Sequence, residues 1–173
     1  MNTILSSELP QGALLKRYED DGSYTDCYHM DLQRGISMDE YIAAFYTTSL
    51  FKVERFILAL VAGKRSIDAN AMELALGQAS RFSAWSVEAR ADNQLLLCDF
   101  LGRTRSWLMV APVPDSAAKS TRLYFGSAVV PKSRSLSGKA SFGLAFHALY
   151  DFHRLYTKAL MYAARSTLSK ARP

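Results

Sequence analysis

The longest amphipathic pattern in the chain runs from Ser141 to Ala164. Its apolar residues recur at steps of three and four, the spacing that places them on one face of a helix. Ser141 stands where a hydroxyl can accept from the unpaired N–H groups of the first turn. So wide an apolar stripe has to be covered, and we therefore predict that this helix lies across the face of a sheet. The stripe consists of Phe142, Ala145, Phe146, Leu149, Phe152, Tyr156, Leu160 and Ala163.

A second pattern, with a period of two, precedes this helix and predicts β-strands. Such alternation is typical of strands, in which successive side chains point to opposite faces of the sheet. In the second of these runs Trp85, Val87 and Ala89 fall on one side. The connections between the later runs are short, so we expect neighbouring strands to pair antiparallel, as a meander. The five predicted strands are Tyr24–Leu32, Phe82–Arg90, Leu95–Phe100, Arg105–Val113 and Thr121–Val130.

A block of helices is predicted between the first two of these strands. Ser37 and Glu40 fit the capping box, in which each side chain bonds to the backbone N–H of the other residue. The helix that begins there should end after Tyr46, because the adjacent hydroxyls of Thr47–Ser49 compete for the backbone. Two further helices are predicted at Leu50–Ala62 and at Asp68–Leu76, the second capped by Asp68 and each followed by a glycine.

This order of elements predicts an α+β fold: an antiparallel meander with a helical block after its first strand and a long C-terminal helix. The length of 173 residues suits a single domain, 1–173. Within it we expect a loosely ordered lead-in at residues 1–22, a body at residues 24–164 and a basic tail at residues 165–173.

Composition excludes several classes of protein. With 49% hydrophobic and 21% charged residues the chain is expected to be globular rather than disordered. The net charge of +5 comes without a dense basic run or an aromatic-interleaved motif, so no nucleic-acid partner is expected. The start lacks the features of a secretory signal, and no apolar run approaches the roughly 20 residues of a membrane span. We therefore expect a cytoplasmic protein without stable membrane insertion.

The residues that commonly bind metals are sparse. The two cysteines, Cys27 and Cys98, fall in predicted strands and lack a CxxC spacing, so we interpret them as buried thiols. His29 shares a strand face with Asp31, but nothing nearby in the sequence completes a metal site. We expect neither a metal nor a cofactor.

The runs Asp99–Leu108 and Arg122–Ser127, together with the order of elements, resemble the START-related (SRPBCC) superfamily, which has the helix-grip fold. In that family a curved antiparallel sheet wraps the last helix and leaves an apolar cavity between them. The resemblance covers roughly residues 24–164. The chain departs from the family in having five predicted strands, which is fewer than usual, and a longer helical block.

The resemblance implies that some aromatic residues line a ligand cavity. Trp85, Trp107 and Phe125 are candidates, together with the stripe of the final helix, because small-molecule sites are mostly apolar. The alternative is that the same residues interlock as a solid core, as they do in most protein interiors.

His147 and Asp151 are four residues apart on the predicted helix and so share a face. The carboxylate can orient the imidazole, which makes His147 a candidate general base or ligand-orienting donor. His147 is flanked by Phe146 and lies near Tyr150, at the edge of the apolar stripe, so all three are candidate ligand contacts. The alternative is a partly exposed histidine paired with a surface acid.

Two charged residues lie inside predicted strands. Asp99 has the same parity as Leu95 and Leu97, and Arg105 has that of Trp107. If these faces point inward, each charge needs a partner. The partner could be the other member of this pair, across the hairpin at Gly102, or a polar group of a ligand; otherwise both charges point into solvent.

The sequence therefore leads to three hypotheses. The first is a protein without enzymatic activity that binds a small, mainly apolar molecule between the sheet and the final helix. The alternative is an enzyme of the same fold, resembling the superfamily's cyclases, with His147 in acid/base chemistry. A third is a surface interaction module with a filled core. No nucleophile elbow, Walker loop, dinucleotide fingerprint or HExxH motif is present, and the oligomeric state stays open.

Overall fold

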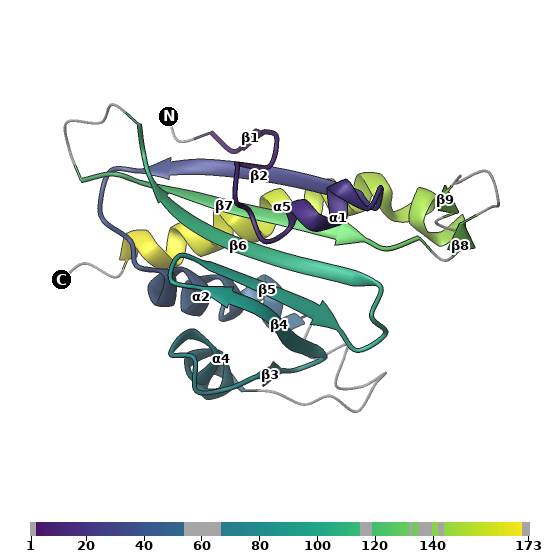
Figure 1. Cartoon of the computed structure of the whole chain (residues 1–173). Helices are drawn as coiled ribbons and strands as arrows, with labels where there is room; N and C mark the ends of the chain where they lie inside the picture. Colours follow the sequence, from purple (N-terminus) through teal and green to yellow (C-terminus); the bar gives the residue numbers. More distant parts are fainter. Residues whose placement is uncertain are drawn as a thin grey trace.

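A computed structural model of the chain describes residues 3–53, 67–114, 119–131, 133–134, 140–141 and 144–170. It describes no side chains for residues 133–134, 140–141 and 144–153. One antiparallel sheet organises the fold, with α2 and α5 behind it and the N-terminal segment in front in Figure 1. The predicted α+β class is confirmed.

The sheet has seven strands in the order β1-β2-β7-β6-β5-β4-β3. Strands β4 to β7 form the predicted meander, and β2 pairs with β7. The strands are β1 (Leu5–Ser6), β2 (Tyr24–Leu32), β3 (Arg81–Phe82), β4 (Trp85–Ala91), β5 (Gln94–Asp99), β6 (Thr104–Pro112) and β7 (Thr121–Val129), and a separate pair is formed by β8 (Ser133–Arg134) and β9 (Ala140–Ser141). The helices are α1 (Lys16–Asp20), α2 (Met38–Tyr46), α4 (Asp68–Ala75) and α5 (Leu144–Lys170), and residues 49–53 are also helical.

The start and end of α2 follow the sequence prediction. The hydroxyl of Ser37 accepts from the backbone N–H of Glu40 at 3.1 Å, and the Glu40 carboxylate accepts from the N–H of Ser37 at 2.8 Å. The helix ends at Tyr46, where the hydroxyls of Thr47 and Thr48 donate to backbone carbonyls of the last turn. The capping box and the break are both confirmed.

The other two helices of the predicted block differ from the expectation. Asp68 is the first residue of α4 rather than its cap; the cap position is Ile67, whose N–H donates to the Asn70 side chain at 3.0 Å. Of the predicted helix Leu50–Ala62, residues 50–53 are helical, and the rest lies outside the described residues.

The main core lies between the sheet and the helices. Phe45 of α2 stacks on Phe125 of β7 with ring centroids 5.0 Å apart, and Tyr46 packs against Phe51 and Phe82. The second half of α5 completes this cluster with Leu160, Met161, Ala164 and Leu168.

The boundaries of α5 correct two predictions. Ser141 does not cap the helix, because it lies in β9 opposite Ser133, and the helix begins at Leu144. The helix also continues past Ala164 to Lys170, through most of the predicted basic tail. The physical reason is that Leu168 extends the buried edge by one more turn, at the same spacing of four residues.

The N-terminal segment, predicted as a loosely ordered lead-in, forms a second core on the opposite face of the sheet. It contributes β1 and α1, and Leu15 is fully buried there against Trp107. Gln94 fixes the segment: its side-chain oxygen accepts from the N–H of Leu14 and from the Trp107 indole, both at 2.9 Å, and its amide donates to the carbonyl of Gly12 at 3.0 Å.

A β-bulge at Glu88 overturns one assignment of residues to a sheet face. The β4–β5 register shifts between Val87 and Ala89. One extra residue reverses the alternation along a strand. Trp85 and Val87 therefore pack against the main core, whereas Ala89 packs against the N-terminal core.

The network at Gln94 gives a first prediction. Gln94→Leu should lower the free energy of unfolding by about 2 to 4 kcal/mol, because it leaves two buried N–H donors and one carbonyl without their partner. Urea denaturation measures this change. The matched control is Gln78→Leu at an exposed position, where we expect a change within about 0.5 kcal/mol. Equal effects of the two substitutions would contradict the role of Gln94.

Candidate ligand-binding site

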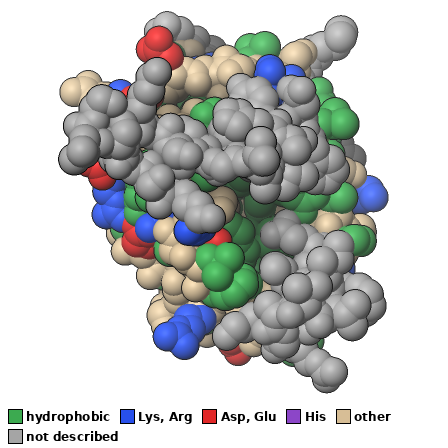
Figure 2. All heavy atoms as spheres, turned by 90° about the vertical axis from the view of Figure 1, so that its right-hand side faces the viewer, with side chains coloured by type: hydrophobic (Ala, Val, Ile, Leu, Met, Phe, Trp, Pro, Cys, Tyr) green, Lys and Arg blue, Asp and Glu red, His purple; other side chains and the backbone are tan. Residues whose placement is uncertain are grey.

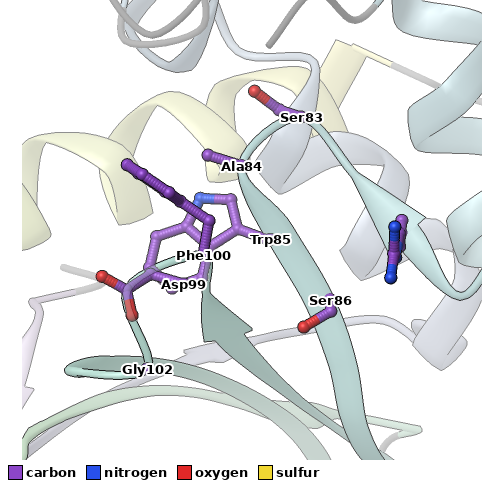
Figure 3. A pocket seen from close by; sticks show the side chains of 8 residues that line it. Ser83, Ala84, Trp85, Ser86, Asp99, Phe100 and Gly102 are labelled. Carbon is purple, nitrogen blue, oxygen red and sulfur yellow. The ribbon is translucent and has the colours of Figure 1, made fainter. Parts of the chain in front are cut away.

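A hollow of about 380 Å³ opens at one end of the sheet, where the β3–β4 and β5–β6 turns meet. Ser83 and Trp85 line it from one turn, and Asp99 and Phe100 from the other (Figure 3). Seen from this end, hydrophobic side chains reach the molecular surface (Figure 2). Phe100 as a residue is 52% exposed, although it forms part of the hollow's wall.

The register of the sheet brings two of the predicted site residues together. Trp85 on β4 is directly opposite Asp99 on β5, and residues in such a pair extend from the same face. The Asp99 carboxylate accepts from the N–H groups of Arg103 at 2.7 Å and of Thr104 at 3.1 Å. Asp99 therefore holds the β5–β6 turn in place and shapes the rim of the hollow.

Two hydrogen-bonding atoms of residues that line the hollow are buried and lack a partner among the described residues: the Ser83 hydroxyl and the indole N–H of Trp85. Buried polar atoms are nearly always hydrogen-bonded, and leaving one unpaired costs about 1 to 3 kcal/mol. A molecule in the hollow that reached these atoms would supply the partner that each of them lacks.

The other predicted ligand contacts are distributed over both faces of the sheet. Phe125 belongs to the main core, where it stacks on Phe45. Trp107 lies on the opposite face, fully buried under the N-terminal segment. Trp85, Trp107 and Phe125 therefore do not line one common space.

Arg105 also lies on the N-terminal face, and it does not pair with Asp99. Its Nε donates to Glu88 and to the Tyr18 hydroxyl, both at 2.7 Å, and its guanidinium stacks over the Tyr18 ring at 4.7 Å. The partner is Glu88, which follows Val87 in β4 and therefore points to the opposite face, the one that carries Arg105.

The candidates on the final helix cannot be placed in the same way. Phe146, His147, Tyr150 and Asp151 lie in α5, but their side chains are outside the described part of the structure. The acid/base hypothesis for His147 therefore stays a prediction.

Sequence reasoning missed Ser83 and Phe100. The run Phe82–Arg90 was interpreted as one strand, whereas Ser83 and Ala84 form a two-residue turn between β3 and β4. Of these two residues only serine is a type that is common in turns, and it is the one local signal that could have revealed the turn. Phe100 was assigned to a strand but stands at the exposed turn after Asp99.

A second hollow, of about 590 Å³, lies at the start of α2 and is lined by Ile36, Ser37 and Thr121 among others. The polar groups of these residues already have partners. The Thr121 hydroxyl accepts from the N–H of Ile36 and donates to the carbonyl of Arg34, and Ser37 is engaged in the capping box. This second hollow is therefore the weaker candidate.

Among the residues that the structure describes, no group of three or more His, Cys, Asp or Glu side chains could hold a metal ion. Cys27 is buried, as predicted, and burial raises the pKa of its thiol to about 11. Cys98 is only partly buried.

Asp31, considered from the sequence together with His29 as an incomplete metal site, accepts two hydrogen bonds from Arg122, at 2.7 and 2.8 Å, and these hydrogen bonds lower its pKa. The Nδ1 atom of His29 is buried and has no partner among the described residues. Burial, and to a smaller extent the Arg122 cation, lower the pKa of His29 below its ordinary value.

No protein-family model, curated protein or solved structure matches the chain. In the part of the chain that the structure describes, no helix has the length and the apolar character that crossing a membrane requires. A functional proposal therefore depends on the fold and on the geometry of the hollow.

The environment of His29 gives a second prediction. Because its pKa is lower in the folded state, the unfolded chain binds the extra proton first, and His29 contributes stability that is present above about pH 6.5 and lost as the pH falls. Urea unfolding of wild type and His29→Gln between pH 8 and pH 5 tests this. We expect a shallower loss of stability in the variant; parallel curves would contradict the assignment.

Proposed function

We propose that the protein binds a small, mainly apolar molecule in the hollow beside Trp85. The observation that carries this proposal is a hollow with aromatic walls, lined by two residues whose buried donors have no partner in the part of the chain that the structure describes. Its volume of about 380 Å³ falls within the range of roughly 300 to 1,000 Å³ that is typical of small-molecule sites.

The proposed source of affinity is the removal of apolar surface from water. Trp85 and Phe100 offer rings from two different turns, and Phe100 is half exposed. Each 100 Å² of apolar surface that the ligand covers would contribute about 2.5 kcal/mol before the cost of association. An apolar ligand body that fits against both rings therefore suffices for measurable binding.

The resemblance to the helix-grip superfamily supports the same proposal, because that family holds apolar ligands between its sheet and last helix. In this chain Leu160, Met161 and Ala164 of α5 are buried in the main core. These residues fill the space between the sheet and the second half of the helix. We therefore place the proposed ligand at the end of the sheet, where the β3–β4 and β5–β6 turns meet, rather than along the whole helix.

Two neighbouring residues allow a matched test. Phe100 lines the hollow, whereas Leu101 is 65% exposed and does not line it. With the fluorescent apolar probe N-phenyl-1-naphthylamine, Phe100→Ala should weaken binding by about tenfold, because it removes one wall. Leu101→Ala should leave the affinity unchanged. Both residues are exposed enough that neither substitution should disturb folding.

Fluorescence titration of the probe gives the affinities, and circular dichroism checks the fold of each variant. If wild type does not bind the probe, or if Phe100→Ala and Leu101→Ala have equal effects, the proposed function is wrong. Native mass spectrometry of the purified protein would add the mass of any apolar compound that copurifies with it.

A further inference from the structure

The turn that borders the hollow has an unusual backbone. Ser83 has φ +54°, and in the described part of the chain it is the only residue other than glycine with a positive φ. It occupies the first position of the two-residue connection between Phe82 and Trp85, which pair with each other. Hairpins of this kind prefer glycine where φ is positive, because a side chain is strained there.

No hydrogen bond from the Ser83 hydroxyl to a described residue offsets the strain of its backbone. Serine in a turn usually offsets its backbone conformation through a hydrogen bond from its hydroxyl to nearby backbone groups. The Ser83 hydroxyl is instead buried and has no partner in the described part of the chain. Neither the turn nor a hydrogen bond to a described residue explains why serine rather than glycine stands here, and backbone strain of this kind gathers at functional sites.

Trp85 supplies a second donor to the same hollow. A buried indole N–H normally has an acceptor, and Trp107 follows this rule, with the Gln94 oxygen at 2.9 Å. The N–H of Trp85 has no acceptor among the residues that the structure describes. In Figure 3 the Ser83 hydroxyl and the Trp85 indole nitrogen lie on the same side of β4 as Phe100.

The charges around the hollow favour an uncharged ligand. Of the described residues that line it, Arg81 is the cation and Asp99 the anion, so the charges of these two balance. Asp99 is also committed to the backbone of the β5–β6 turn. A full charge on the ligand would thus gain no net counterion and would lose its hydration.

We propose that the hollow recognises a neutral molecule with an apolar body and one carbonyl oxygen, as in a ketone, ester or amide. The carbonyl oxygen accepts hydrogen bonds from the Ser83 hydroxyl and the Trp85 indole N–H, while the apolar body lies against Phe100. This inference rests on the proposed function and adds the polar group by which the ligand is selected.

Two probes that differ in a single oxygen isolate this recognition. 2-Acetylnaphthalene carries a ketone, and 2-ethylnaphthalene has the same ring and a side chain of similar size without the oxygen. Ser83→Ala and Trp85→Phe each remove one donor and keep most of the hollow's shape. We expect each variant to bind the ketone about three- to tenfold more weakly than wild type does. Binding of the hydrocarbon should be unchanged in Ser83→Ala, whereas Trp85→Phe, which also removes part of an apolar wall, should weaken the ketone more than the hydrocarbon. Equilibrium dialysis measures both affinities.

Ser83→Gly separates the hydroxyl from the backbone strain. Glycine relieves the positive φ, so the ratio of folded to unfolded protein should rise by about fivefold, whereas Ser83→Ala retains the strain. Both variants should lose the same preference for the ketone. Urea unfolding measures the stability of the two variants, and the dialysis experiment measures their binding. Ser83→Gly should thus be more stable than wild type and yet bind the ketone more weakly.

The outcomes separate this inference from the proposed function. If both naphthalenes bind wild type and the variants weaken both equally or neither, the carbonyl recognition is wrong and the apolar site stands. If neither naphthalene binds wild type, the proposed function fails, and the inference fails with it. A gain in stability for Ser83→Gly without any loss of ketone binding would show that the serine is not a ligand contact.

Discussion

Burial of both faces of one antiparallel sheet is the constraint on which the rest of the structure depends. One face is covered by α2, α4 and α5 through a cluster of aromatic and aliphatic side chains, and the other by the N-terminal segment. Gln94 attaches the N-terminal segment to the sheet: it lies in β5, inside the sheet, and its side chain hydrogen-bonds to the backbone of residues 12 and 14. Neither face could be left open to water without exposing a continuous apolar surface.

The bulge at Glu88 connects this two-sided burial to the candidate site. Glu88 alternates with Val87 and points toward Arg105 and Tyr18 on the N-terminal face, where the three side chains form one hydrogen-bonded group. Trp85 and Val87, before the bulge, point to the helical face, and this places Trp85 beside Asp99. The bulge lets the next residue, Ala89, also pack on the N-terminal face, so that the outer part of β4 contributes to that core while its start lines the hollow.

The sequence was sufficient wherever the signal was local. The Ser37 capping box and the alternating strands depend on neighbouring residues, and the bounds of β2, β5, β6 and β7 were predicted within one position. The exception is β4, which begins three residues after the predicted start at Phe82. The N-terminal segment and the bulge depend on contacts with distant residues, such as Leu15 with Trp107, which periodicity does not encode. Of the predicted ligand contacts, Trp85 and Asp99 line the same hollow because β4 and β5 are adjacent strands, whereas Trp107 had the right residue type on the wrong face.

The position of the hollow at this edge follows from the distribution of stability. Many contacts between buried rings stabilise the main core. In contrast, β3 is a two-residue strand at the edge of the described sheet, where its neighbour is β4. A strained turn and two unpaired donors together cost on the order of several kcal/mol, an amount that a well-packed domain tolerates only where a few local contacts are affected. A ligand that satisfied both donors would recover part of that cost on binding. The edge of the sheet is therefore where the fold can retain such polar groups for recognition without losing its core.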